Sequence, residues 1–252
     1  MKRHLTAAMT ATVFALAAGS AAFAAPGLGE RVYTPYVRNG VTEVEIRTGR
    51  LNGGPEAGDS ATVVELERGL NDRVSLALLA EFEDEPGADV RVDAVAIESV
   101  VYLGQIPGAG IDVGVYLEYE QRLHAESGVA EAKLLLARQV GPFQGLVNLI
   151  ARQPLTDRDG EGDMRFGYAA QATFEVRPHL TLGLQAFGDL GTNRDLGGAQ
   201  AHYIGPMIGF ELHPPGLPGE LDFEAAFLLP AGTAREDADS QLRLMVEWEH
   251  RF

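Results

Sequence analysis

The residues of this chain that could do chemistry are mostly carboxylates, and many of them recur at every second position. Residues two apart share one face of a β-strand, so this spacing predicts a charged face. Its predicted acidic members are Glu43, Glu45, Glu65, Glu67, Glu81, Asp112, Glu118, Glu120, Glu131, Glu175, Asp222, Glu224, Glu247 and Glu249. Its predicted basic members are Arg47, Lys133, Arg152, Arg165, Arg243 and Arg251. In a confined passage such a face filters solutes by charge, whereas mutually paired charges would give a closed interior.

Other chemistries have weaker support in the sequence. A serine hydrolase needs a serine beside a positioned histidine, and the strand serines Ser60, Ser75 and Ser99 have no histidine in a recognisable motif. A protease-like acid–base site at one rim would need side chains that lie far apart in the chain: Glu83, His124, Asp189 and His202. We favour ordinary rim polarity for these residues. The five histidines beyond the leader, His124, His179, His202, His213 and His250, show no metal-ligand spacing, so we expect no catalytic residue, metal or cofactor.

The composition excludes several classes of protein. The 252 residues include no cysteine, so neither a disulfide nor a thiolate metal site is available. The formal charge is −16, and lysine occurs only at positions 2 and 133. Phosphate contacts need clustered Lys or Arg, so we expect no nucleic-acid partner.

The first residues have the features of a secretory signal peptide. Lys2 and Arg3 precede an apolar run, and Ala22-Phe23-Ala24 fits the small-residue pattern before a cleavage site. We therefore expect a signal peptide over 1–24, a lead-in without clear periodicity over 25–40, and one domain over 41–252. No apolar stretch of about 18 residues follows that could form a transmembrane helix.

The elements that must position the charged face are strands. In "MRFGYAAQATFEV" (164–176) apolar side chains alternate with polar or small ones, and helical spacing does not fit. Similar runs occur at about 41–51, 60–69, 73–83, 90–104, 111–122, 129–140, 143–153, 164–176, 180–190, 200–212, 220–229 and 241–252. The runs at 90–104, 143–153 and 200–212 alternate less cleanly, and the direction in which their side chains point stays open.

Long alternating strands can form a soluble sandwich with an apolar core or a membrane barrel with an apolar outside. The runs match the 9–11 residues or so of a tilted membrane strand, their number is even, and short connections alternate with long ones. Aromatic residues also gather near both ends of the runs, as in interfacial girdles. These features predict an all-β fold, a single antiparallel up-and-down transmembrane β-barrel of about 12 strands. Twelve strands do not decide between an open and a filled lumen.

The chain ends in "QLRLMVEWEHRF", an alternating strand that stops on an aromatic residue. This end resembles the C-terminal signature of Gram-negative outer-membrane β-barrels. The resemblance implies that the last strand closes the barrel and that Trp248 and Phe252 form a signal for the barrel-assembly machinery. His250 departs from the apolar residue usual on its face. Location in the outer membrane and contact with its lipid and lipopolysaccharide are further implications.

A narrower likeness involves "VYTPYVRNGVTEVEIRTG" (32–49), "QAHYIGPMIGFEL" (200–212) and the last strand. These segments are similar to outer-membrane proteins described as channels of the phenol meta-degradation type, which implies a transport role without a specific substrate. We therefore expect a narrow channel or transporter for small solutes with an acid-rich lumen. The alternatives are a structural or partner-binding barrel with a closed lumen, and an outer-membrane lipid-modifying enzyme or protease.

Overall fold

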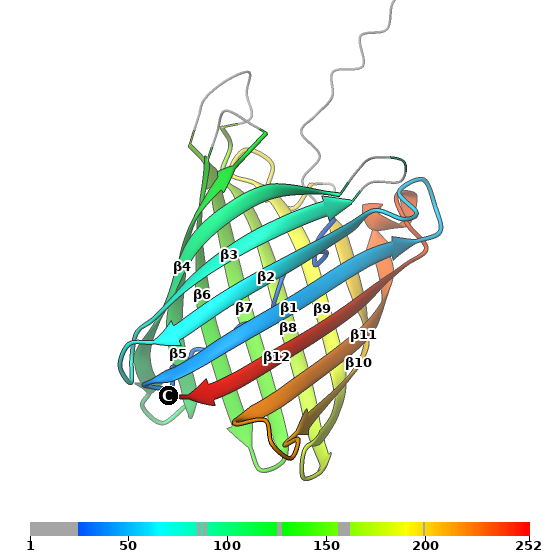
Figure 1. The fold of residues 1–252 in the computed structure, drawn as a ribbon. Coiled ribbons are helices and arrows are strands. Elements are labelled where there is room, and N and C mark those ends of the chain that lie inside the picture. Colours follow the sequence, from blue (N-terminus) through cyan, green and yellow to red (C-terminus); the bar gives the residue numbers. More distant parts are fainter. Residues whose placement is uncertain (1–24, 85–86, 88–89, 125–127, 156–161, 199) are drawn as a thin grey trace, which may run out of the picture.

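The computed structural model describes residues 25–84, 87, 90–124, 128–155, 162–198 and 200–252. The signal peptide expected over 1–24 lies outside the described residues. Twelve antiparallel strands form a closed barrel, as the alternating pattern predicts (Figure 1). They are β1 (Val41–Asn52), β2 (Ser60–Gly69), β3 (Ser75–Asp84), β4 (Arg91–Ile106), β5 (Ile111–Arg122), β6 (Gly128–Val140), β7 (Phe143–Pro154), β8 (Arg165–Arg177), β9 (Leu180–Thr192), β10 (Ala201–Leu212), β11 (Glu220–Gly232) and β12 (Ser240–Arg251). A short 3-10 helix, η1 (Thr233–Glu236), precedes β12.

The last strand closes the barrel by pairing with the first. Twelve consecutive pairs join β1 to β12, from Val41 opposite Arg251 to Asn52 opposite Ser240. A closed sheet has no edge strand, so the main-chain donors and acceptors of both strands find partners within the wall. The expectation that the C-terminal strand pairs with the first strand is confirmed.

Large apolar side chains cover the outside of the barrel. Ile46, Leu78 and Leu184 are 51%, 59% and 54% exposed, although each lies in the middle of a strand. The aromatic residues predicted for the two girdles fall on this outward set as well. An apolar belt of this kind is stable against lipid and unfavourable in water.

The burial pattern shows which way the side chains point in the three strands whose alternation is weak in the sequence. In β4 the side chains of Ala94, Ala96 and Glu98 point inward and those of Val95 and Ile97 point outward. In β7 the inward set contains Leu146, Asn148 and Ile150, and in β10 it contains Tyr203 and Met207. Both faces of these strands carry apolar residues, which is why their alternation is weak in the sequence.

One connection departs from the predicted strict alternation of short and long loops. The β6–β7 and β8–β9 turns contain two residues each, 141–142 and 178–179, but the β10–β11 connection at the same end spans 213–219. This connection contains three prolines, which cannot donate hydrogen bonds to a ladder, so the strands begin pairing later. Within the described residues, no helix has the length and apolar character needed to cross a membrane.

Candidate functional site: the lumen and the segment inside it

The register places the predicted charged residues on the inward side of the wall. Glu45, Glu65, Glu131 and Arg243 are at most 9% exposed, while their neighbours along each strand face outward. The other predicted lumen residues lie on the same alternate positions: Glu43, Glu67, Glu81, Asp112, Glu118, Glu120, Glu175, Asp222, Glu224, Arg47, Arg152 and Arg165. The side chain of Glu175 is exposed at the short-turn rim. The facing of this set agrees with the sequence pattern.

The lumen also contains a segment that the sequence pattern left as a lead-in. Residues 25–40 run inside the barrel before β1 begins, and part of this stretch is visible as the blue coil within the wall in Figure 1. Leu28, Val32 and Tyr33 in this segment are only 6%, 8% and 3% exposed. We refer to residues 25–40 as the lumen segment. Its side chains make contacts with several strands around the wall.

Glu30 of the lumen segment binds two basic residues of the wall. Its carboxylate lies 2.7 Å from Nη2 of Arg152 and also accepts a hydrogen bond from Lys133. Lys133 in turn lies 3.0 Å from Glu131, which also pairs with Arg152. The four charges form a closed network, which is the arrangement that makes buried charge tolerable.

Arg31 points to the opposite side of the lumen. Its guanidinium lies 2.6 Å from Glu45 on β1 and 2.8 Å from Glu247 on β12. Arg47 on β1 bridges Glu45 and Glu65 at 2.6 Å each and donates from Nε to the main-chain oxygen of Gly29. The carboxylates of β1 and β12 are therefore partly neutralised by a cation that the lumen segment supplies, and the β2 carboxylate Glu65 by Arg47 of the wall.

Tyr33 is held by main-chain and side-chain hydrogen bonds. Its N–H donates to Oδ1 of Asn148 at 2.7 Å, and Nδ2 of Asn148 donates to its carbonyl oxygen at 2.9 Å. The Tyr33 hydroxyl donates to Glu98 at 3.2 Å, and its ring packs 4.6 Å from that of Tyr116. Nζ of Lys133 lies 4.5 Å from the centre of the Tyr33 ring, within cation–π range.

The far end of the lumen segment is fastened at the short-turn rim. Arg38 lies 3.1 Å from Glu43 and 3.3 Å from Glu220, and it also pairs with Glu249. The Arg38 side chain is 44% exposed, so water screens these rim ion pairs and they stabilise the segment less than the buried pairs do. Together the contacts fix the lumen segment in its middle, from Glu30 to Tyr33, and near its C-terminal end, at Arg38.

Three inward glycines leave room for the lumen segment. A Cβ atom at Gly49 would lie 2.1 Å from the carbonyl oxygen of Leu28, and one at Gly69 would lie 2.0 Å from that of Arg38. A Cβ atom at Gly114 would lie 2.8 Å from Cβ of Pro35. Glycine at these places allows another backbone to approach the strand closely. The wall is therefore shaped to accept this segment.

The two sides of the lumen differ in polarity. Leu28 and Val32 belong to an apolar cluster with Leu146, Phe187 and Leu228, on the β7–β11 part of the wall. The ion-pair networks lie mainly on β1, β2, β6 and β12. A segment that carries both apolar and charged side chains fits between these two walls.

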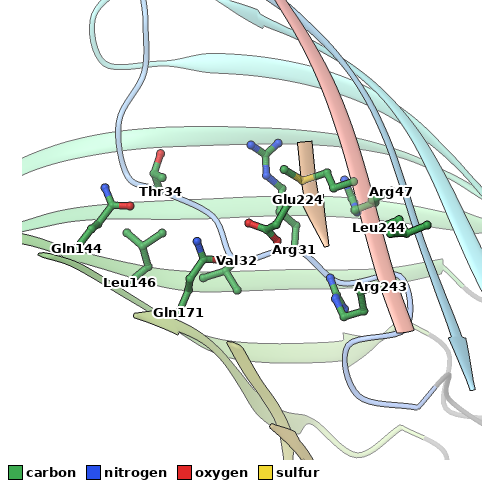
Figure 2. A pocket seen from close by; sticks show the side chains of 11 residues that line it. Arg31, Val32, Thr34, Arg47, Gln144, Leu146, Gln171, Glu224, Arg243 and Leu244 are labelled. Carbon is green, nitrogen blue, oxygen red and sulfur yellow. The ribbon is translucent and has the colours of Figure 1, made fainter. Parts of the chain in front are cut away.

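A cavity of about 140 Å³ remains between the lumen segment and the wall (Figure 2). It is lined by Arg31, Val32, Thr34, Arg47, Gln144, Leu146, Gln171, Glu224, Arg243, Leu244 and Met245. The guanidinium of Arg243 lies over the Phe187 ring at 4.1 Å and donates from Nη2 to the main chain of Glu30. Its Nε and Nη1 have no hydrogen-bond partner among the described residues. The cavity thus presents guanidinium donors beside amide groups and one carboxylate.

Several lumen residues are absent from the predicted set. Glu98, Asn148 and Gln185 are at most 2% exposed, and Glu30 and Arg31 lie outside the strands altogether. Glu98 sits in a largely apolar run, and the lumen segment has no strand periodicity, so the alternation rule gives no signal for them. The long-range partners of the segment become visible only when the barrel is closed.

Asp189 and His202, an acid and a histidine considered for a protease-like site, are not brought together. Asp189 faces the lumen and accepts a hydrogen bond from Arg165 at 2.9 Å. His202 lies on the outward set and contacts the Tyr168 hydroxyl at 3.3 Å. His124 contacts the carbonyl oxygen of Val92 at 3.1 Å. Asp189 and His202 therefore lie on opposite faces of the sheet and do not form an acid–base pair.

Comparison with known proteins identifies the fold. No family model matches the chain, and no curated protein matches it either. An outer membrane channel from Pseudomonas putida F1 shares 12% identity with a TM-score of 0.57, covering 86% of this chain and 97% of that one. The NanC porin shares 11% identity with a TM-score of 0.57, covering 81% and 98%. A KdgM porin in complex with disordered oligogalacturonate shares 8% identity with a TM-score of 0.53, covering 83% and 99%. The chain therefore has the fold of outer-membrane β-barrel channels and porins.

Proposed function

We propose that this protein is a narrow outer-membrane channel for small solutes, with the lumen segment as its constriction. The observation that carries the proposal is the polar interior: inward charges and amides surround a cavity of about 140 Å³ beside the segment. A purely structural barrel would gain more stability from a packed apolar interior than from buried charge. The fold shared with other channels supports the same conclusion.

The seated lumen segment limits what can pass. A water molecule takes about 30 Å³ in the liquid, so the cavity has room for several waters. The wall facing it is the β7, β8, β11 and β12 side. Water and small solutes move along this side, and larger solutes need the segment to shift.

The charge of the lumen favours cations and neutral solutes modestly. Acidic side chains outnumber basic ones on the inward face, and Glu81, Glu118 and Glu120 lie toward the long-loop mouth. Carboxylates in a confined passage raise the local cation concentration. Arg31, Arg47 and Arg243 at the constriction offset part of this effect.

The same features support a location in the outer membrane. The apolar belt faces the lipid of the outer membrane, and the longer loops face lipopolysaccharide at the cell surface. The signal peptide over 1–24 directs export, and the strand that ends in Trp248 and Phe252 presents the signal to the barrel-assembly machinery. Heat-modifiable migration of the membrane fraction on gels tests this placement, and recovery in the soluble periplasmic fraction would contradict it.

Planar-bilayer recordings test the channel. The full-length barrel and a variant lacking residues 27–34 are refolded in detergent and inserted separately. We expect a small conductance with a modest cation preference for the first, and a several-fold larger conductance for the second. A barrel that conducts in neither form would be a closed structural or partner-binding protein, the competing function that the filled lumen favours.

A further inference from the structure

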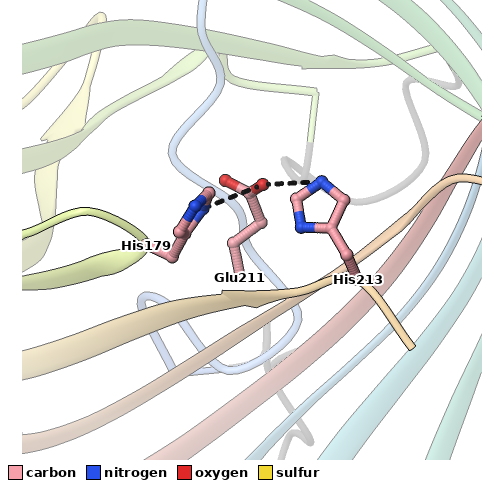
Figure 3. A group of neighbouring side chains, drawn as sticks. All are labelled: His179, Glu211 and His213. Atoms are coloured by element: carbon pink, nitrogen blue, oxygen red, sulfur yellow. Dashed lines mark ion pairs between the residues drawn. The ribbon is translucent and has the colours of Figure 1, made fainter. Parts of the chain in front are cut away.

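Two connections at the short-turn end bring two histidines to one glutamate. His179 lies in the β8–β9 turn, Glu211 lies near the end of β10, and His213 follows β10 directly. Figure 3 shows both rings pointing at the Glu211 carboxylate. His179 has a positive φ of 66°, and every other positive φ in the described part of the chain belongs to a glycine. The backbone therefore holds the His179 ring in an unusual place for a non-glycine residue.

The distances between these side chains are those of ligands around a shared centre. Nδ1 of His179 lies 3.2 Å from Oε1 of Glu211, and Nε2 of His213 lies 3.3 Å from the same oxygen. The three donor atoms are all within 4.8 Å of one another. Zinc binds nitrogen and oxygen at about 2.0–2.2 Å, and tetrahedral angles then separate neighbouring ligands by roughly 3.3–3.5 Å. The separations between each histidine nitrogen and the Glu211 oxygen are close to these ligand–ligand distances.

We propose that His179, Glu211 and His213 bind a divalent transition-metal ion, with Zn²⁺ as the best match. A fourth ligand would come from water or from Glu220, whose Oε2 lies 3.4 Å from Nε2 of His213 but which falls outside the group that shares the 4.8 Å limit. Two imidazoles with one or two carboxylates form a set that suits zinc more than magnesium or calcium, which prefer oxygen alone. This site is independent of whether the barrel conducts.

The surroundings leave the group open to an ion. One oxygen of Glu211 faces a nitrogen of each ring, so an ion bound there would replace the hydrogen bonds from both rings. The rings are 54% and 55% exposed, which leaves an open path for a hydrated ion. Asp222 and Glu249 form a further acidic group with Glu220 and attract cations to this rim.

The site is connected to the lumen segment through one residue. Glu220 lies 3.3 Å from Arg38, which also pairs with Glu43 and Glu249. Arg38 contacts Oε1 of Glu220 and His213 contacts Oε2, so this carboxylate joins the proposed metal site to the rim anchor.

Metal titration of the untagged, chelator-treated barrel tests the site. We expect isothermal titration with Zn²⁺ to show one saturable ion per barrel. His179→Gln and His213→Gln should each weaken it at least tenfold, Glu211→Gln should do the same, and Glu220→Gln should have a smaller effect. Co²⁺ in place of Zn²⁺ should give the visible absorption of a low-symmetry, four- or five-coordinate ion.

His124→Gln is the matched control, since His124 is an exposed histidine that lies outside this cluster. Each variant is checked for heat-modifiable migration so that folding and binding are separated. Zn²⁺ binding that is equally strong in the wild type and in the folded His179→Gln and His213→Gln variants would overturn the proposal. So would the absence of saturable binding to the wild type.

Discussion

The side-chain amide of Asn148 pairs with the main chain of Tyr33 as a neighbouring strand would. Its Oδ1 accepts a hydrogen bond from the Tyr33 N–H at 2.7 Å, and its Nδ2 donates one to the Tyr33 carbonyl oxygen at 2.9 Å. Asn148 is fully buried and lies 115 residues away in the chain. One wall residue therefore satisfies both main-chain groups of Tyr33, a buried residue near the centre of the lumen segment.

Replacing Asn148 by alanine should unseat the lumen segment part of the time. The change leaves buried main-chain groups without partners, which costs about 1–3 kcal/mol. That is a factor of roughly 5–150 in the ratio of unseated to seated segment. We expect more frequent or longer high-conductance events in single-channel records. Val147→Ala is the control, since Val147 is the neighbour of Asn148 in β7 but its side chain faces outward, away from the lumen. Identical records for Asn148→Ala and wild type would show that this pairing does not hold the segment.

Adding one methyl group at Gly49 should displace the segment without breaking the barrel. A Cβ atom there would lie 2.1 Å from the Leu28 carbonyl oxygen, far inside contact distance. The backbone pairs of Gly49 with Ala61 and Arg243 do not depend on its side chain. We expect Gly49→Ala to raise the mean conductance and to keep heat-modifiable migration.

Gly145→Ala is the matched control for this substitution. Gly145 also lies in a strand, but an added Cβ would meet nothing within 4 Å, so its conductance should equal that of the wild type. An unchanged conductance in Gly49→Ala, or an equal change in both variants, would argue against a segment seated on β1.

Arg243 should reduce the cation preference of the constriction. It is buried, it lines the cavity, and its Nε and Nη1 have no partner among the described residues. Its positive charge is therefore available to attract anions and repel cations in the passage. Under a salt gradient, Arg243→Ala should shift the reversal potential further toward the value expected of a purely cation-selective channel. Arg138→Ala, on the exposed outward set of β6, should leave it unchanged. A shift toward anions would contradict the prediction, because removing a positive charge from the passage, whether or not it neutralises Glu224, cannot make the passage favour anions.

The barrel could be predicted because the pattern that determines it lies within short, continuous stretches of the sequence. Alternation with period two, a strand length near the membrane thickness and an even number of runs are all visible in a single chain. The inward facing of residues such as Glu45 and Arg243 follows from the same rule. The rule is weakest for β4, β7 and β10, where apolar residues lie on both faces, as Val95 and Ala96 do in β4.

The position of the lumen segment could not be predicted because it depends on contacts between residues that lie far apart in the sequence. Glu30 pairs with Arg152 across 122 positions, and Arg243 reaches the main chain of Glu30 across 213. His179 and His213 belong to different turns and meet only through the register of β8 to β11. Spacing along the chain carries no information about such contacts.

Deleting Phe252 should impair assembly in cells while leaving the finished barrel intact. Phe252 is 75% exposed and lies beyond the last pair of the β1–β12 ladder, so few contacts in the folded protein depend on it. Its ring packs 4.5 Å from that of His250 and 6.2 Å from that of Trp248, which forms an aromatic end to the last strand. We expect a several-fold loss of heat-modifiable protein in the membrane fraction, and normal refolding of the purified variant in detergent. Deletion of Glu236, in the loop before β12, is the control and should leave membrane yields near those of the wild type. Equal membrane yields for the two deletions would show that the terminus is not an assembly signal, and a matching loss in detergent refolding would show that Phe252 acts on stability instead.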